Sequence, residues 1–147
     1  MISESDWVPT DGLELEPEAL LAVKETRNTL VEAGPGSGKT ELLSQKANYL
    51  FTTGICSEPK RILAVSFKKD SAVNLADRVA LRVEREDSRR FSSRTFDSFA
   101  KNLLDRFLNG LPLEWRPTKS YRIDERYFVS ACQFHNIQFR YNTDDRK

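Results

Sequence analysis

The sequence has few of the residues that cross-link small domains or bind metals in them. Its 147 residues include two cysteines, Cys56 and Cys132, and a single histidine, His135. The cysteines are far apart and form no C-x-x-C pair, and the histidine stands at no recognised metal-ligand spacing from either. This composition excludes a disulfide framework and the common zinc sites, and it favours a reducing, cytoplasmic environment.

Long apolar runs and a surplus of one charge are also missing. No stretch approaches the roughly 20 apolar residues that a membrane-spanning helix needs, and the acidic N-terminal residues form no secretory signal, so we expect no membrane partner. The formal net charge of +1 predicts no partner either. Basic residues nevertheless outnumber acidic ones between residues 60 and 94. This excess of positive charge could bind an anionic partner, and it is explained equally well by a helical face that is exposed to solvent.

One motif is present in full. Residues 33–40 read AGPGSGKT, which matches the phosphate-binding Walker A pattern with Ala33 in place of its first glycine. The apolar, β-branched run at 28–33 predicts a buried strand before the motif. Residues 41–51 predict a helix after it, whose inner face consists of Leu43, Ala47, Leu50 and Phe51. An ordinary glycine turn is the alternative, but it gives no reason for a Lys-Thr pair at this position.

Such a loop holds a nucleoside triphosphate together with Mg²⁺. Glycines at 34, 36 and 38 let the backbone curl so that its N–H groups converge, and the positive end of the following helix adds to their attraction for phosphate. We expect Lys39 to contact the β- and γ-phosphates and the Thr40 hydroxyl to ligate Mg²⁺, which makes these two the candidate catalytic residues. The predicted nucleotide-binding set is Ala33, Gly34, Pro35, Gly36, Ser37, Gly38, Lys39, Thr40 and Glu41.

Around this motif, helices alternate with short strands. Trp7 is expected to pack on the domain, and a helix is predicted at 13–26. A strand at 61–67 is apolar on both faces, as parallel strands covered by helices tend to be, and a helix at 69–85 follows it. The inner face of that helix is predicted to hold Ala72, Leu75, Ala76, Val79 and Val83, with Arg78, Arg82 and Arg85 facing outward.

Further along, a strand is predicted at 91–95, a helix at 96–108 with Phe99, Leu103 and Phe107 in the core, and a last helix at 124–136. The alternation predicts an α/β fold with a parallel sheet. Nucleotide hydrolysis also needs an acidic residue at the end of an apolar strand, and Asp124 is better explained as a helix cap. The chain therefore resembles the first part of an NTPase without its catalytic acid.

Three stretches, in order, resemble motifs of UvrD/Rep-type superfamily 1 DNA helicases. Residues 33–40 are similar to motif I, residues 62–79 (ILAVSFKKDSAVNLADRV) to motif Ia, and residues 92–104 (SSRTFDSFAKNLL) to motif Ib. The resemblance implies the N-terminal part of the first motor domain, an α/β, RecA-like P-loop NTPase whose parallel sheet is flanked by helices and is incomplete. The implied parts are a flexible N-terminus at 1–12, a partial ATP-binding domain at 13–110 and a helical segment at 111–147.

By the same resemblance, the ends of two strands form a track for single-stranded DNA. An aromatic ring can stack on a base, and a neighbouring hydroxyl or cation can contact a phosphate. For the two aromatic residues, Phe67 and Phe96, the alternative is packing in the core. The implied DNA-binding residues are Ser66, Phe67, Lys68, Thr95 and Phe96.

Three positions depart from the family's pattern. Ala19 replaces a glutamine that precedes the phosphate-binding motif, and Glu41 replaces the arginine that commonly follows Lys-Thr. Both positions help to hold adenine in the family, so the chain lacks those contacts. Asp97 replaces the histidine of motif Ib, and its carboxylate repels phosphate.

The sequence thus predicts the ATP-binding N-terminal portion of a UvrD/Rep-like DNA helicase, with ATP and Mg²⁺ as cofactors. In the full-length enzyme, hydrolysis would drive translocation on single-stranded DNA. Alone, the chain is expected to bind nucleotide weakly and to unwind nothing until a protein partner or a C-terminal part completes the motor. Two alternatives are a stand-alone module that binds nucleotide or single-stranded nucleic acid without catalysis, and a small P-loop kinase.

Overall fold

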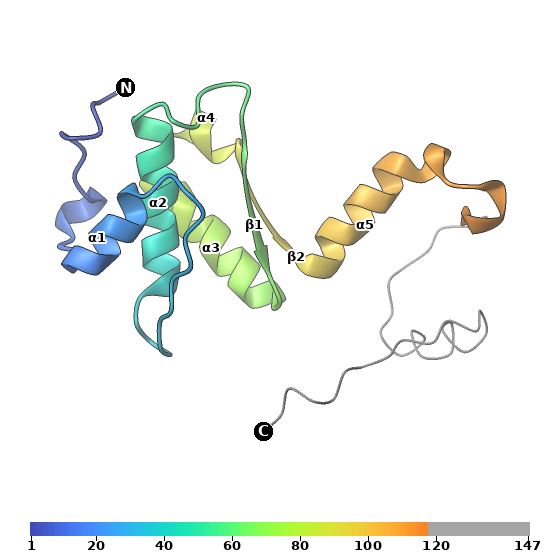
Figure 1. Ribbon diagram of the computed structural model, residues 1–147, viewed down its shortest axis with the longest axis horizontal. Coiled ribbons are helices and arrows are strands. Elements are labelled where there is room, and N and C mark those ends of the chain that lie inside the picture. The colour runs from blue at the N-terminus through green and yellow to red at the C-terminus, as the bar shows by residue number, and fades with distance from the viewer. Residues whose placement is uncertain (118–147) are drawn as a thin grey trace. The chain divides into compact units, whose positions relative to one another are not determined.

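The computed structural model describes residues 1–117, and the chain divides into two compact units, Met1–Phe99 and Ala100–Lys147. The last predicted helix, at 124–136, with Cys132 and His135, lies outside the described residues. In the described part, no helix is long and apolar enough to cross a lipid bilayer. The elements of the first unit (Figure 1) are η1 Thr10–Gly12, α1 Pro17–Lys24, α2 Lys39–Thr52, β1 Ile62–Ser66, α3 Lys69–Arg82, α4 Arg85–Ser88 and β2 Phe91–Thr95.

Helix α5 (Phe96–Phe107) follows β2 and runs from the first unit into the second, where two short 3₁₀ turns, Leu108–Gly110 and Leu113–Trp115, come next. The helix lies where the sequence predicts one, but none of its residues is buried among the described residues. Leu103 is 46% exposed and Phe107 65% exposed. The prediction that these side chains fill a core is therefore wrong for the part of the chain described.

The sheet consists of β1 and β2, which pair in parallel so that Ile62 lies opposite Phe91 and Ser66 opposite Thr95. Helices α3 and α4 connect them, because parallel strands need a crossover rather than a tight turn. Both strands end at the same edge of the sheet, where the chain passes from β1 into α3 and from β2 into α5 (Figure 1). Two segments far apart in sequence thus meet at this edge.

Helix α3 packs against the sheet with the face that its apolar periodicity predicts. Its buried residues are Ala72, Leu75 and Val79, and Leu75 and Val79 join Ala47 and Phe51 of α2 in one core cluster. Ile62, Ala64 and Phe91 of the two strands border this cluster. The opposite face of the sheet is open in the described chain, because Leu63 and Val65 are each 46% exposed. The expectation of a strand covered on both faces is met on one face only.

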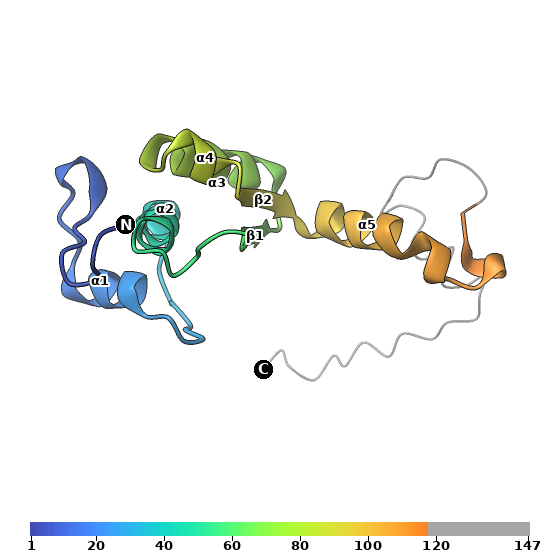
Figure 2. The same ribbon diagram turned by 90° about the horizontal axis from the view of Figure 1, so that it is seen from above.

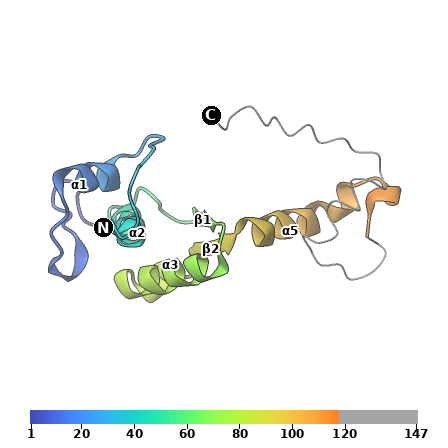
Figure 3. The ribbon, with the colours of Figure 1, turned by 90° about the horizontal axis from the view of Figure 1, so that it is seen from below.

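Helix α2 lies between α1 and α3 (Figures 2 and 3), and it contacts both. Its inner face is partly mispredicted, since Ala47 and Phe51 are buried but Leu43 is 49% exposed. Because α2 packs on two sides, polar side chains are buried as well and need hydrogen-bond partners. Asn48 meets this need by accepting a hydrogen bond from Trp7 Nε1 (2.8 Å) and donating one to the carbonyl of Arg82 (2.6 Å).

The N-terminal residues complete a second core cluster on the other side of α2. Trp7 is 2% exposed and packs edge-on against Tyr49, with 5.2 Å between the ring centroids, and Val23 of α1 completes the cluster. The predicted packing of Trp7 on the domain is confirmed. Ile2 also donates a backbone hydrogen bond to Thr52 (3.0 Å). The division of the chain at residues 13 and 111 stays a prediction.

The strand expected at 28–33 does not form. These residues are exposed and irregular, and Leu30 is 85% exposed. A β-strand needs a neighbouring strand to accept and donate its backbone hydrogen bonds, and within residues 1–117 the only ladder joins β1 to β2. The apolar run therefore has the composition of a strand without the partner that would make it one.

The buried Tyr49 gives a testable pH dependence. Burial, helped by a 2.7 Å hydrogen bond to Glu4, raises the pKa of Tyr49 from 10.0 to about 12. Between these values the folded chain keeps a proton that the unfolded chain releases, so this contribution to stability is complete below the lower value and is lost as pH rises to the higher one. We expect Tyr49→Phe to lose less stability than the parent chain between about pH 10 and 12, measured by urea unfolding. Equal losses in both proteins would contradict this assignment.

Candidate phosphate-binding loop and nucleic-acid interface

Residues 33–40, here called the phosphate loop, lead directly into α2 at the lower end of that helix in Figure 1. Gly36 and Gly38 have φ angles of 79° and 76°, and Gly38 is the left-handed N-cap of α2. Residues with a Cβ rarely adopt such angles, so the backbone itself explains why glycine stands at both positions. No atom lies within 4 Å of where a Cβ at either glycine would stand, so the constraint is conformational rather than steric.

The loop offers several unused N–H groups. Among the described residues, the amides of Gly36, Gly38, Lys39 and Thr40 find no acceptor, whereas the Ser37 hydroxyl donates to the Gly34 carbonyl (2.8 Å). The first amides of any helix lack acceptors within the helix, and here no side chain caps the start of α2. Free amides and the positive end of a helix dipole make a binding site for an anion.

Lys39 and Thr40 are the first two residues of α2, and neither side chain is paired with a carboxylate in the described chain. The exposed ammonium of Lys39 donates to the carbonyls of Ala33 (2.8 Å) and Gly34. These acceptors are neutral, so the positive charge of Lys39 is not cancelled by a carboxylate. The Thr40 hydroxyl has no hydrogen-bond partner within residues 1–117, which leaves it able to ligate a cation. Both residues fit a magnesium–triphosphate group.

Glu41, which the sequence groups with the nucleotide-binding residues, is engaged with α3. Its carboxylate accepts from Arg82 at 3.0 and 3.1 Å and from Arg78 at 2.9 Å. The Arg82 side chain is only 12% exposed, so the prediction that it faces outward is wrong. An acid on the first turn of α2 draws Arg82 inward, and this pairing is a contact between elements that helical periodicity cannot reveal.

The residues around Glu41 extend this contact to η1. Asp11 forms a second ion pair with Arg82, and Gln45, which is fully buried, donates to Glu41 (2.9 Å) and accepts from the Thr10 amide (3.0 Å). We call Asp11, Glu41, Arg78 and Arg82 the Glu41 cluster. It fixes the residue next to Thr40 against α3 and against the N-terminal segment. Sequence reasoning missed it, although an acid after Lys-Thr and arginines four residues apart were visible signals.

A double-mutant cycle tests the Glu41 cluster. We expect Glu41→Gln to lower the free energy of unfolding by about 2 kcal/mol, because it leaves the shielded Arg82 guanidinium without its strongest partner. The coupling of Glu41 with Arg82 should exceed that with Arg78, whose side chain is 49% exposed and whose ion pair should be worth less than about 1 kcal/mol. Urea unfolding followed by tryptophan fluorescence supplies the free energies. Additive effects of Glu41→Gln and Arg82→Gln would contradict a direct pair.

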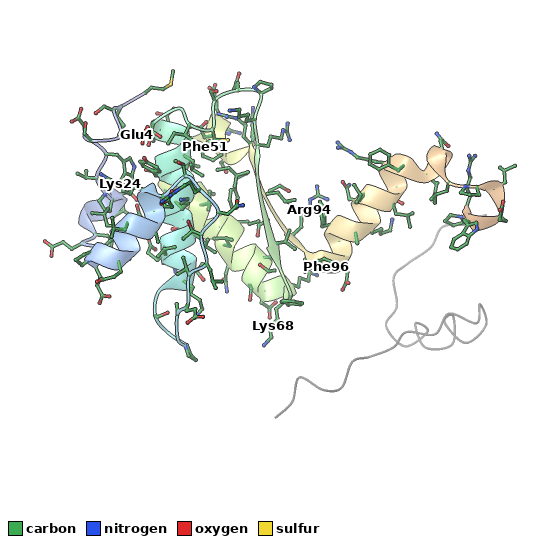
Figure 4. All side chains as sticks on the ribbon, in the orientation of Figure 1. Glu4, Lys24, Phe51, Lys68, Arg94 and Phe96 are labelled. Carbon is green, nitrogen blue, oxygen red and sulfur yellow. The ribbon has the colours of Figure 1, made fainter. Side chains whose placement is uncertain are left out.

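The residues implied in DNA binding gather at the carboxyl edge of the sheet. Ser66 and Thr95 lie opposite each other as the last paired residues, and Phe67, Lys68 and Phe96 follow them immediately. Phe67 is 97% exposed and Phe96 is 60% exposed, so core packing is wrong for both rings among the described residues. Figure 4 shows Lys68 and Phe96 at this edge. The parallel register thus brings together five residues that the sequence places in two groups.

Two further features complete this edge. The Thr95 hydroxyl accepts a hydrogen bond from the Ser98 amide (3.2 Å), which satisfies one free amide at the start of α5. Asp97 is exposed in the first turn of the same helix, where a carboxylate interacts favourably with the helix dipole. The arrangement can stack a base and contact a phosphate, because exposed rings, hydroxyls and a lysine lie side by side.

The sequence also matches a known protein family and a known protein. The family model described as "UvrD/REP helicase N-terminal domain" matches residues 15–141. DNA helicase IV from Escherichia coli (strain K12) is 31% identical over 96 residues, which is 65% of this chain and 14% of that protein. The chain therefore spans a small part of the length of this relative.

Proposed function

The chain belongs to the UvrD/REP helicase N-terminal domain family, and on this premise we propose that it binds Mg-ATP at the phosphate loop and single-stranded DNA at the carboxyl edge of its sheet. The observation that carries the proposal is the common placement of both features. The loop precedes α2, the DNA-binding residues follow β1 and β2, and both lie towards the same end of the first unit in Figure 1. A RecA-like fold and a cytoplasmic location belong to the same proposal.

For the nucleotide, the proposed contacts come from the backbone first. The amides of Gly36, Gly38, Lys39 and Thr40 bind phosphate oxygens, and the Lys39 ammonium turns from the loop carbonyls to the phosphates. The Thr40 hydroxyl ligates Mg²⁺, which when bound neutralises phosphate charge. Glu41 forms ion pairs with Arg78 and Arg82. Its role in the proposal is therefore to hold the start of α2 against α3 and not to contact the adenine base.

For the DNA, exposed aromatic rings and polar groups contact different parts of each nucleotide. Phe67 and Phe96 stack on bases, while Lys68 and the hydroxyls of Ser66 and Thr95 contact the phosphate backbone. Such contacts tolerate any sequence, since every base has a flat face and every nucleotide a phosphate. Binding of this kind weakens as salt rises, because each phosphate contact releases counterions.

Hydrolysis and translocation are proposed only for a more complete motor. Among residues 1–117 the two strands end in Ser66 and Thr95, and neither end supplies the carboxylate that would organise Mg²⁺ for hydrolysis. This favours a chain that binds ATP and DNA but turns ATP over only when a partner or further residues of the motor supply the acid. The described residues therefore support binding more directly than catalysis.

Lys39→Ala tests the nucleotide part. Removing the ammonium should weaken binding of Mg-ATP at least about tenfold, because a charge-assisted hydrogen bond contributes about 1.5–3 kcal/mol. Isothermal titration calorimetry measures the affinity. Lys60→Ala, at an exposed lysine outside the loop, serves as the matched control and should bind as the parent chain does. Unchanged affinity in Lys39→Ala would refute the assignment of the loop.

Phe67→Ala tests the DNA part. Loss of a stacking ring should weaken binding of a labelled deoxythymidine oligonucleotide about tenfold, since stacking on an aromatic side chain is worth about 1–3 kcal/mol per base. Fluorescence polarisation at low salt reports the binding. Leu81→Ala is the matched control, because Leu81 is 81% exposed but lies near the opposite end of α3. If both variants bind as tightly as the parent chain, the edge of the sheet is not the interface.

A further inference from the structure

Residues 1–12, here called the strap, lie along α2 and come before the part of the chain that the family model matches. The strap is the dark blue segment in Figure 1. The Ile2 amide donates to the carbonyl of Thr52, the last residue of α2 (3.0 Å). The Thr10 amide donates to Gln45 in the middle of the same helix (3.0 Å). The strap therefore runs antiparallel to α2, from its last residue back towards the turn that follows the phosphate loop.

One aromatic ring anchors the strap. Trp7 is buried, and its Nε1 donates to Asn48 (2.8 Å). By contrast, Ile2 is 47% exposed and Val8 is 71% exposed. Ordering a chain segment costs conformational entropy for every residue, and here one buried ring and a few hydrogen bonds offset that cost. A segment held in this way detaches at a lower free-energy cost than a helix of the core does.

The end of the strap is bent where it joins the Glu41 cluster. Asp11 has a φ of 58°, and within residues 1–117 it is the only residue other than glycine with a positive φ. Aspartate adopts this left-handed conformation more readily than most residues with a Cβ do. Its carboxylate pairs with Arg82, which also donates to Glu41 at 3.0 and 3.1 Å. The bend thus connects the strap to the residue that follows Thr40.

A second set of contacts leads from the strap to the same carboxylate. Gln45 accepts from the Thr10 amide and donates to Glu41 at 2.9 Å, and Gln45 is fully buried. The side chains of Glu41 and Arg82 are 18% and 12% exposed. Hydrogen bonds and ion pairs are stronger where water is excluded. Detachment of the strap would remove the contacts of Thr10 and Asp11 and admit water, so the first turn of α2 would be held less firmly.

We propose that the strap positions the phosphate loop for Mg-ATP: when docked it holds the first turn of α2 in the orientation that binds, and its release weakens binding. The inference rests on the proposed function, because it takes the phosphate loop as the nucleotide site. Asp11 and Thr10 are positioning residues, which act through Arg82 and Gln45 and contact no nucleotide. Free amides that already converge bind phosphate more tightly, since less conformational entropy is lost on binding. The coupling is reciprocal, so bound Mg-ATP also holds the strap in place.

Asp11→Asn tests the strap while preserving its backbone. Asparagine also adopts the left-handed conformation but carries no charge, so the ion pair with Arg82 is lost. Mg-ATP should bind about fivefold more weakly, at the lower end of usual couplings between sites, as measured by isothermal titration calorimetry. Glu14→Gln is the matched control, because it removes one negative charge at an exposed residue outside the strap. This control should bind Mg-ATP as the parent chain does.

A stability control separates positioning from a general loss of structure. Ile62→Ala truncates a partly buried side chain at the start of β1, which borders the core cluster and lies outside the strap, the phosphate loop and the Glu41 cluster. It should lower the melting temperature more than Asp11→Asn does, because a lost apolar contact costs more than an exposed ion pair, and yet leave the affinity for Mg-ATP unchanged. If affinity falls with melting temperature in both variants, the strap contributes only to stability and the proposal is overturned.

The reciprocal effect has its own measurement. The chain has two tryptophans, and Trp115 is 69% exposed, so Trp115→Phe leaves Trp7 as the single reporter of the strap. Acrylamide gains access to this buried ring when the strap detaches. Saturating Mg-ATP should therefore reduce the quenching of Trp7 about fivefold. The reduction should be smaller in the same chain with Lys39→Ala at an equal concentration of Mg-ATP. Quenching that Mg-ATP leaves unchanged would overturn the proposal.

The outcomes keep this inference apart from the proposed function. If Lys39→Ala weakens binding of Mg-ATP and Asp11→Asn does not, the strap is no positioning element and the assignment of the phosphate loop stands. If the parent chain does not bind Mg-ATP, the proposed nucleotide site fails and this inference fails with it. Weaker binding by Asp11→Asn, together with protection of Trp7 by Mg-ATP, supports the strap as a positioning element.

Discussion

The ion pairs of Glu41 with Arg78 and Arg82 join the two helices from which the candidate site is built. Helix α2 begins inside the phosphate loop, and α3 begins at the end of β1, so the relation between the two helices sets the relation between loop and sheet edge. The Arg82 side chain is largely shielded, and its backbone carbonyl accepts from Asn48 at 2.6 Å. Charge-assisted hydrogen bonds are directional, and they therefore fix this relation more tightly than apolar contact alone.

The same contacts connect the nucleotide and DNA parts of the proposed site. Glu41 is adjacent to Thr40, and α3 begins directly after Phe67 and Lys68. Helix α2, the Glu41 cluster and α3 thus form a continuous set of contacts between the loop and the edge of the sheet. The contacts with α3 therefore explain why Glu41 stands next to the phosphate loop, and the explanation requires no contact between Glu41 and a nucleotide base.

Much of the fold could be predicted from local patterns. The apolar spacing of residues 72, 75 and 79 identified the buried face of α3, and the apolar run before Phe67 located β1. Strand β2 also forms where a strand was predicted, at 91–95. The predictions failed where burial depends on a partner from elsewhere in the chain. Leu43 is exposed while Gln45 and Asn48 are buried, because α2 meets neighbours on two sides and those neighbours supply hydrogen bonds. The run at 28–33 stays irregular since a strand forms only against another strand.

By itself, the sequence determined the family, the glycines at positions 36 and 38 and the order of β1, α3, β2 and α5, because these depend on residues that are neighbours in the chain. The tertiary structure alone decided that Ser66 and Thr95 lie opposite each other, that Arg82 turns inward to Glu41, and that Asp11 pairs with Arg82. Each of these joins side chains that are far apart in sequence. Such contacts follow from strand register and helix packing, which a one-dimensional pattern does not encode.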